Sequence, residues 1–226
     1  AAFDEKVKSI SITLYRIADN SKIAEALILA SSKGKKVTAF VEIKARFDEE
    51  ANLSWALEMS KSGIDIHYSF PGLKVHSKIC LIEREENNST KLYVYLSTGN
   101  FNEITALIYS DYGLFTCDTR LTKECKKVFN FLTRNTTQEK FSHLLAAPFN
   151  LRSSFEDLID FEIAQAGAGR KGYIILKLNS LEDKKIIRKL YEASQAGVRI
   201  DIIVRGICCL VPGIKDLSDK IKVISI

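Results

Sequence analysis

The sequence lacks the features of a membrane protein and of a disulfide-stabilised fold. No apolar run approaches the roughly 20 residues that a transmembrane helix needs. The first ten residues lack the charged-then-apolar order of a signal peptide. The five cysteines form an odd number without C-x-x-C spacing, which predicts neither a disulfide framework nor a zinc site. We therefore expect reduced thiols and a cytoplasmic protein, with peripheral membrane association left open.

Extremes of composition are absent as well. Of the 226 residues, 46% are hydrophobic and 27% are charged, which is typical of a globular protein and excludes a disordered or fibrous one. This length allows one large domain or two modest ones. The net charge of +5 is too small to identify a partner, although its sign favours anionic ligands such as phosphates or nucleic acid.

Strand and helix patterns alternate along the first half of the chain. Runs of β-branched and apolar residues predict three strands, at 9–15, 36–43 and 64–70. Helical spacing of apolar residues predicts two helices between them, one from 19–21 to Gly34 and one at 49–62. Strands alternating with helices in this way predict an α/β layer fold.

The pattern changes after the third strand. Two further strands are predicted at 75–82 and 92–96, with the polar residues 83–90 as a surface loop between them. Helices are predicted at 121–133 and 154–166. The irregular stretch between these helices predicts a domain boundary near 146–151.

The second half of the chain repeats the first. Residues 21–46 align with 184–209 without a gap, and 9–16 resemble 172–179 in kind. The alternative is that any two βαβ units look alike. We favour a duplicated α/β domain, with residues 1–146 as the first domain and 147–226 as the start of a second, incomplete one.

One histidine stands out by its surroundings. Strand alternation places His76 and Lys78 on the same face of the strand predicted at 75–82. The small-residue turn at 97–100 follows the next strand, and its amides, or the side chain of Asn100, could hold a phosphate or orient the imidazole. By itself H-x-K is a weak signal, since a solvated strand face offers the same residues; the combination in a duplicated fold is more specific.

This combination resembles the phospholipase D superfamily. Its duplicated halves each contribute an H-x-K segment followed by a Gly/Ser-rich turn with Asn, and its histidine attacks phosphorus. The resemblance implies two similar α/β domains, each with a mixed sheet flanked by helices. The superfamily often has Asp five residues after the lysine; Glu83 stands there in this chain, so the usual pattern is not kept.

Within that superfamily the chain is most similar to the polyphosphate kinase family. The similarity runs through most of the sequence, at residues 13–23, 41–56, 71–82, 97–116, 147–152 and 202–213. It implies reversible transfer of the terminal phosphate of ATP to inorganic polyphosphate through a phosphohistidine. ATP or ADP and polyphosphate would be the substrates, Mg²⁺ the cofactor, and a homo-oligomer the full-length state, with no nucleic-acid partner.

The family resemblance also implies roles for individual residues. His76 corresponds to the histidine that is phosphorylated, with Lys78 and Asn100 as further catalytic residues. The remaining roles are binding ones: Arg16 and Arg46 at the magnesium and phosphate site, Tyr109 and Arg205 at the nucleotide.

These roles have alternatives. An arginine at a strand end is as often a solvated side chain, and Tyr109 without the resemblance is a half-buried aromatic. His67 and His143 are expected in core or surface roles. Two other functions stay open, a phosphodiesterase or nuclease of the phospholipase D type and a polyanion-binding domain without turnover.

Overall fold

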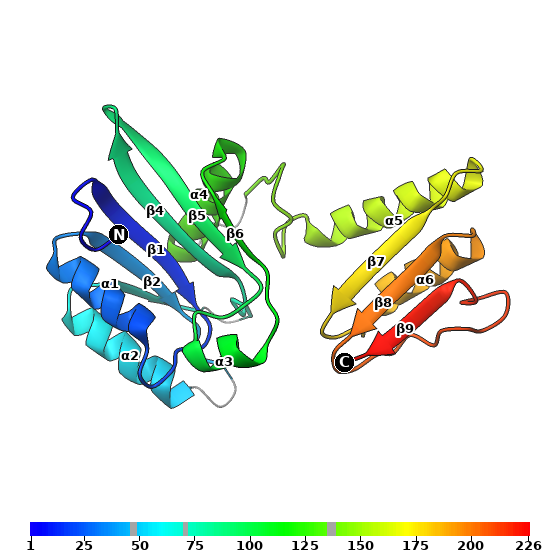
Figure 1. Cartoon of the computed structure of the whole chain (residues 1–226), viewed down its shortest axis with the longest axis horizontal. Coiled ribbons are helices and arrows are strands. Elements are labelled where there is room, and N and C mark those ends of the chain that lie inside the picture. Colours follow the sequence, from blue (N-terminus) through cyan, green and yellow to red (C-terminus); the bar gives the residue numbers. More distant parts are fainter. Residues whose placement is uncertain (46–48, 70–71, 135–138) are drawn as a thin grey trace. The chain divides into compact units, whose positions relative to one another are not determined.

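The chain folds into two compact units, Ala1–Leu144 and Leu145–Ile226. A computed structural model describes all residues except 46–48, 70–71 and 135–138 (Figure 1). All five cysteines are free thiols, as expected. None of the described helices combines the length and the apolar character that a membrane span requires.

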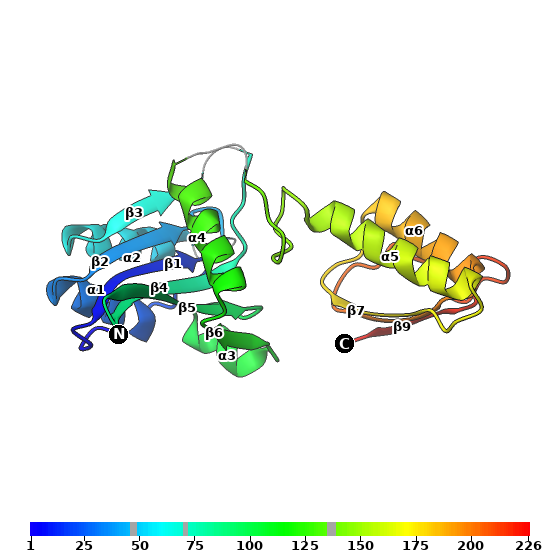
Figure 2. The same cartoon turned by 90° about the horizontal axis from the view of Figure 1, so that it is seen from above.

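The first unit is built on a six-stranded mixed sheet. Its elements are β1 (Val7–Leu14), α1 (Lys22–Ser32), β2 (Lys36–Val41), α2 (Glu49–Lys61), β3 (Asp65–Tyr68), β4 (Lys78–Glu86), β5 (Ser89–Ser97), α3 (Glu103–Ile108), β6 (Gly113–Thr116) and α4 (Thr119–Arg134). The strand order is β3-β2-β1-β4-β5-β6, with β1 to β3 parallel and the rest antiparallel. This arrangement confirms the predicted mixed sheet flanked by helices (Figure 2).

Helix α1 shows why the first half of this sheet forms as predicted. Its N-cap residue Ser21 accepts a hydrogen bond from the Ala24 amide at 3.3 Å. Gly34 follows the helix at φ +77°, a conformation that glycine adopts without a steric penalty. One helical face is buried against β1 and β2 through Ala24, Leu27 and Ala30.

The prediction that all of residues 83–90 form a loop is wrong, because strands β4 and β5 continue almost to the tip of their hairpin. Strands β4 and β5 pair as far as Glu86 with Ser89. Only Asn87 and Asn88 form the turn, at φ 49° and 60°. Asparagine tolerates this left-handed conformation, and two such residues give a turn whose twist matches that of the strands.

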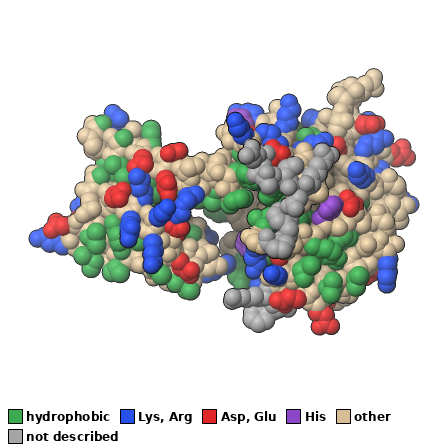
Figure 3. Space-filling view, turned by 180° about the vertical axis from the view of Figure 1, so that it is seen from behind, with side chains coloured by type: hydrophobic (Ala, Val, Ile, Leu, Met, Phe, Trp, Pro, Cys, Tyr) green, Lys and Arg blue, Asp and Glu red, His purple; other side chains and the backbone are tan. Residues whose placement is uncertain are grey.

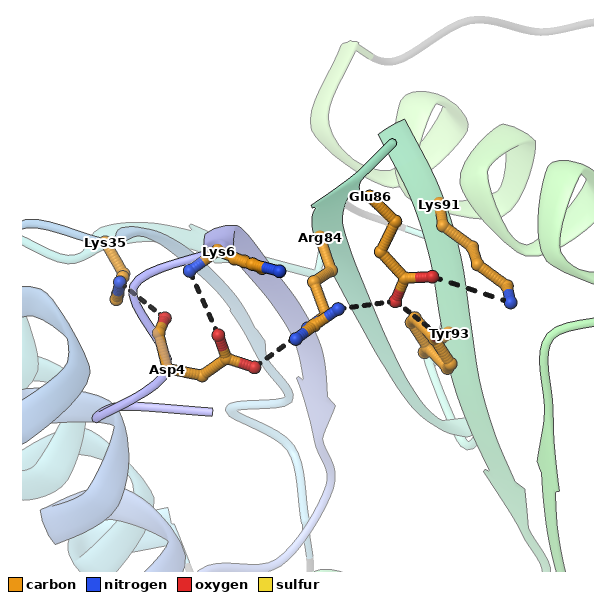
Figure 4. Close-up of polar contacts among 7 residues, drawn as sticks. All are labelled: Asp4, Lys6, Lys35, Arg84, Glu86, Lys91 and Tyr93. Carbon is orange, nitrogen blue, oxygen red and sulfur yellow. Dashed lines mark hydrogen bonds and ion pairs between the residues drawn. The ribbon is translucent and has the colours of Figure 1, made fainter. Parts of the chain in front are cut away.

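Polar side chains hold the N-terminal segment to this hairpin (Figure 4). The Arg84 guanidinium donates to Asp4 at 2.8 Å and to Glu86 at 2.6 Å, and the Tyr93 hydroxyl also donates to Glu86 at 2.6 Å. These contacts explain why a stretch rich in charged residues forms strands. Lys91 of β5 also pairs with Glu86 of β4 across the hairpin, at 3.7 Å.

The second unit is smaller and has one parallel sheet. Its elements are α5 (Leu151–Gly167), β7 (Tyr173–Leu178), α6 (Lys184–Gln195), β8 (Arg199–Val204) and β9 (Ile221–Ser225). Helices α5 and α6 cover one face of the β7-β8-β9 sheet (Figure 2). Basic and acidic side chains mix on the helical face, where Lys189 of α6 contacts Asp160 of α5 at 2.6 Å (Figure 3).

The two units share the predicted internal repeat, with one correction. Strand pairing joins Leu14 to Val41 in the first unit and Leu178 to Val204 in the second. Val41 and Val204 correspond in the gapless alignment, whereas Leu178 lies one residue further along than that alignment puts Leu14. Residues 15–21 join β1 to α1 and residues 179–183 join β7 to α6, so in the second unit the strand ends one residue later and the helix begins one residue earlier than the alignment predicts.

Candidate active site around His76

His76 lies in an irregular segment and not on a strand. Strand β4 begins only at Lys78, so the strand predicted at 75–82 starts three residues too early in the sequence. The reason is that backbone groups on both sides of His76 bond to side chains. The Val75 amide donates to the Glu42 carboxylate at 2.8 Å, and the Ser77 carbonyl accepts from a threonine hydroxyl at 2.8 Å.

His76 and Lys78 are nevertheless in contact, as their spacing predicts. The Lys78 ammonium nitrogen Nζ lies 3.1 Å from His76 Nδ1 and donates to the His76 carbonyl at 2.6 Å. The Lys78 side chain is buried, and this burial lowers its pKa to about 8. The negative charge of Asp111 raises the Lys78 pKa in part, so Asp111 acts as a counter-charge to this amine.

The surroundings of His76 favour its neutral form. Partial desolvation of the ring lowers its pKa below the ordinary value of 6.5, and the positive charges of Lys78, Lys74 and Arg16 lower it further. At neutral pH the imidazole therefore keeps an unprotonated nitrogen. A neutral imidazole nitrogen is the form that can act as a nucleophile.

Tyr15, which the sequence did not single out, connects these groups. Its ring packs edge-to-face on His76, with centroids 4.5 Å apart and planes at 71°. Lys78, Lys74 and Arg16 lie 4.9, 5.6 and 5.8 Å from the centroid of the Tyr15 ring, within the range of cation–π attraction. The signal for Tyr15 was its place at the end of a strand, directly before Arg16.

The turn at 97–100, the predicted phosphate cradle, contacts an acidic side chain. The Thr98 hydroxyl donates to the Asp111 carboxylate at 3.1 Å. A Cβ on Gly99 would lie 2.5 Å from Asp111 Oδ2, so glycine leaves the space that this carboxylate fills. In the structure the turn therefore holds Asp111, the counter-charge of Lys78, and Asp111 is a site residue that the sequence did not reveal.

Asn100 lines an apolar hollow of about 610 Å³. The aromatic walls of the hollow include Tyr93, Tyr95 and Phe115, and Cys80 of β4 also lines it. Asn100 Oδ1 is buried and has no hydrogen-bond partner among the described residues. None of the described contacts joins Asn100 to His76, and the two predicted roles, holding a phosphate or orienting the imidazole, stay predictions.

The other predicted residues lie on other elements of the chain. Tyr109 caps the C-terminal end of α3, with 44% of its surface exposed. Arg205 follows β8 in the second unit and is exposed. Arg46 lies outside the described residues. The structure thus brings together His76, Lys78 and Arg16 from the predicted set.

A protein-built metal site is not found in the described part of the chain. No group of three or more His, Cys, Asp or Glu side chains there is arranged to hold an ion. The groups around His76 are instead mainly cationic, which suits phosphate oxygens. A Mg²⁺ ion at this site would fit only as a partner of substrate phosphates, the usual mode for this ion.

Comparisons with known proteins agree along the whole chain. Residues 1–138 match the family model for polyphosphate kinase C-terminal domain 1, and residues 144–226 match that for polyphosphate kinase C-terminal domain 2. Polyphosphate kinases from Halalkalibacterium halodurans and Klebsiella pneumoniae are 50% and 46% identical over all 226 residues. The chain covers 32% and 33% of these two proteins, so it spans about one third of their length.

A solved structure shows the same similarity. The crystal structure of polyphosphate kinase from Porphyromonas gingivalis matches 99% of this chain with a TM-score of 0.88 and 47% sequence identity. The match covers 37% of that chain. Agreement at this level extends to both units and to the segment that carries His76.

Proposed function

This chain belongs to the polyphosphate kinase family, and from that premise we propose that it carries the phosphoryl-transfer site of an ATP:polyphosphate phosphotransferase. The observation that supports the proposal best is His76, held in contact with Lys78 and depressed in pKa by burial and three cations. A nucleophile of this kind needs a neutral ring and positive charge for the phosphate oxygens. Both are present within one cluster.

In the proposed reaction an unprotonated ring nitrogen of His76 attacks the terminal phosphorus of ATP. A nitrogen–phosphorus bond forms, the bond between that phosphorus and the bridging oxygen breaks, and ADP leaves. A terminal oxygen of polyphosphate then attacks the same phosphorus, and the imidazole leaves with its electron pair. The polyphosphate is then longer by one phosphate, and His76 is regenerated. Each step can also run in reverse.

The other residues of the proposal serve charge stabilisation and positioning. Lys78 and Arg16 would stabilise the charge that spreads over the phosphoryl oxygens, and Arg46 would join them. A guanidinium suits phosphate because its fork binds two oxygens at once. Tyr109 and Arg205 would contact the nucleotide. Mg²⁺, when bound, neutralises phosphate charge.

The domain assignment is part of the same proposal. Residues 1–146 would form the first catalytic domain and 147–226 would belong to the second. The two family models and the two compact units support this division. Asn100 is kept as a catalytic candidate, although none of the described contacts joins it to His76 or Lys78.

The test is whether His76 becomes phosphorylated. A polypeptide of the relatives' length that carries this sequence is incubated with γ-labelled ATP and magnesium, and label is measured as acid-labile, base-stable phosphate. We expect label on His76 and its loss in His76→Ala, while His67→Ala and His143→Ala keep it. Label that persists on another residue in His76→Ala would refute the assignment, and phosphate release from a diester without a phosphoenzyme would favour the phosphodiesterase alternative.

A further inference from the structure

Two buried side chains hold the backbone on either side of His76. The Glu42 carboxylate accepts from the Val75 amide at 2.8 Å, one residue before His76. The Thr13 hydroxyl donates to the Ser77 carbonyl at 2.8 Å, one residue after it. Glu42 and Thr13 are each only 1% exposed, so water does not compete for these bonds.

Each of these two side chains makes further bonds that fix its own position. Thr13 also accepts from the Ile79 amide at 2.9 Å. Glu42 also accepts from the Lys44 amide and from the Ser69 hydroxyl, both at 2.9 Å. A buried carboxylate with three donors is satisfied and rigid, whereas one that has lost its donors is costly.

A third buried residue, Asn52 of α2, holds the segment that carries Arg16. Its Oδ1 accepts from the Ile17 amide at 2.9 Å, and its Nδ2 donates to the Tyr15 carbonyl at 2.9 Å. The same Nδ2 donates to the Glu42 carbonyl at 2.8 Å. Asn52 thus links the two residues around Arg16 to the residue that holds Val75.

We propose that Thr13, Glu42 and Asn52 form a buried polar frame that positions His76 and Arg16 relative to each other for phosphoryl transfer. None of the three touches the reacting groups, so they are positioning residues. The proposal rests on the proposed function. Its physical reason is that a misplacement of about 1 Å in a reacting group can slow a reaction by about 10²-fold.

The chain contains a matched control for Glu42. Glu124 of α4 is 5% exposed and its carboxylate also accepts three hydrogen bonds, from the amides of Ser142, His143 and Leu144 at 2.8, 3.0 and 2.8 Å. It has the same chemistry as Glu42 but holds the segment around His143. Glu42→Gln and Glu124→Gln are therefore expected to reduce stability alike, while only Glu42→Gln disturbs His76.

The first experiment observes the imidazoles directly. The chain has three histidines, so ¹³C-labelled rings can be titrated one by one by NMR on the 226-residue chain. We expect Glu42→Gln to raise the pKa of His76 as the ring moves away from its cationic neighbours, and to leave the ring chemical shifts of His143 unchanged. Loss of a negative charge alone would lower the His76 pKa, so a rise reports displacement. Glu124→Gln should change the ring chemical shifts of His143 and leave those of His76 as they are.

The second experiment measures the proposed chemistry in the longer polypeptide. We expect Glu42→Gln to slow phosphohistidine formation at saturating ATP by about 10- to 100-fold with little change in the KM for ATP. Glu124→Gln should stay within about twofold of the wild type. Thr13→Ser, which keeps the hydroxyl, should retain the rate, and Thr13→Val, which has the same shape without it, should lose it.

The two readouts separate the frame from the function. A wild-type protein without phosphohistidine would reject the proposed function, and the frame as a device for this reaction would fall with it, although the titration would still show whether Glu42 places His76. If the wild type is phosphorylated, the frame is overturned by unchanged His76 signals in Glu42→Gln, or by equal rates in Glu42→Gln and Glu124→Gln.

Discussion

The second strands of the two units end at equivalent positions, but the residues that follow them have opposite charges. Glu42 follows Val41 in the first unit, and Arg205 follows Val204 in the second. Glu42 is buried with three hydrogen-bond donors, whereas Arg205 is exposed. The same scaffold position thus holds a buried carboxylate that fixes a loop in one unit and an exposed arginine in the other.

The interiors of the two units differ in the same way. The buried polar residues described in the first unit include the charged side chains Glu42, Lys78 and Glu124, while those described in the second unit are Ser194 and Ser218. Burying polar groups is costly unless each finds a partner. The first unit carries this cost at the segment around His76, which is what a preorganised site requires.

Exchanging the residue types at positions 42 and 205 should give the largest difference in unfolding free energy between the two units. In Glu42→Arg a cation replaces a buried carboxylate among three donors, and we expect the first unit to lose about 3–5 kcal/mol of unfolding free energy. Arg205→Glu, the reverse exchange at an exposed position, should cost less than Glu42→Arg, because contacts at an exposed site are screened by solvent.

Urea unfolding followed by fluorescence measures this difference. The chain has one tryptophan, Trp55 of α2, which donates to the Ala18 carbonyl at 2.9 Å and so reports on the first unit. Far-UV circular dichroism follows both units. Equal losses in the two variants would show that the strand ends are equivalent after all.

Alanine substitution of one glycine in each unit should have smaller effects on the free energy of unfolding. A Cβ at Gly99 meets the Asp111 carboxylate, whereas nothing lies within 4 Å of one at Gly167, the last residue of α5. We expect Gly99→Ala to cost about 1 kcal/mol or more and Gly167→Ala to stabilise the second unit by about 0.5–1 kcal/mol. Unfolding midpoints in urea give both numbers.

The Gly99→Ala variant should also change the pKa of Lys78. The negative charge of Asp111 raises the Lys78 pKa, so moving this carboxylate away should lower that pKa below its value of about 8. NMR titration of the lysine side chain tests this. An unchanged Lys78 pKa together with a loss of stability would mean that the turn supports the fold and not the site.

The sequence predicted the parallel half of the first unit because its signals are local. Apolar spacing in 22–32 and the glycine at position 34 define α1 without reference to the rest of the chain. The hairpin is predicted, but its strands are longer than the sequence indicates, because two asparagines make the turn in place of a longer loop. His76 was placed on a strand because its backbone partners, Glu42 and Thr13, lie 33 and 64 residues from the groups they bind.

The same reasoning explains which site residues were found. His76, Lys78 and Arg16 carry chemistry that is recognisable in any fold. Asp111 and Tyr15 became visible only through their contacts, since an exposed acid and a strand-end aromatic are common. A sequence therefore reveals reactive groups more readily than the side chains that hold them.

Removing the Lys78 charge should have a moderate effect that is confined to the first unit. Its ammonium disfavours a second positive charge, so Lys78→Met should raise the pKa of His76 toward 6.5. Because the Lys78 pKa is about 8, this amine is charged over the whole range in which His76 titrates, and the full effect is expected there. Lys189→Met in α6 is the control and should leave the His76 titration curve unchanged. An unshifted His76 in Lys78→Met would contradict the contact.

The smallest effect concerns a feature that the units share. Asp118 before α4 and Asp183 before α6 each contact an arginine, Arg120 and Arg152, and each has a pKa lowered to about 2, chiefly by that side-chain hydrogen bond. A carboxyl whose pKa is lower in the folded state than in the unfolded state contributes stability at pH values above its unfolded pKa of about 3.8. This contribution disappears as the pH falls toward 2.

Asparagine is also a good N-cap residue, so Asp118→Asn and Asp183→Asn remove the charge and keep the cap. Each variant should be slightly less stable than the wild type at pH 7, and this difference should vanish between pH 4 and pH 2 in urea titrations. A difference that persists at pH 2 in one unit only would show that the two caps, unlike the strands behind them, are not equivalent.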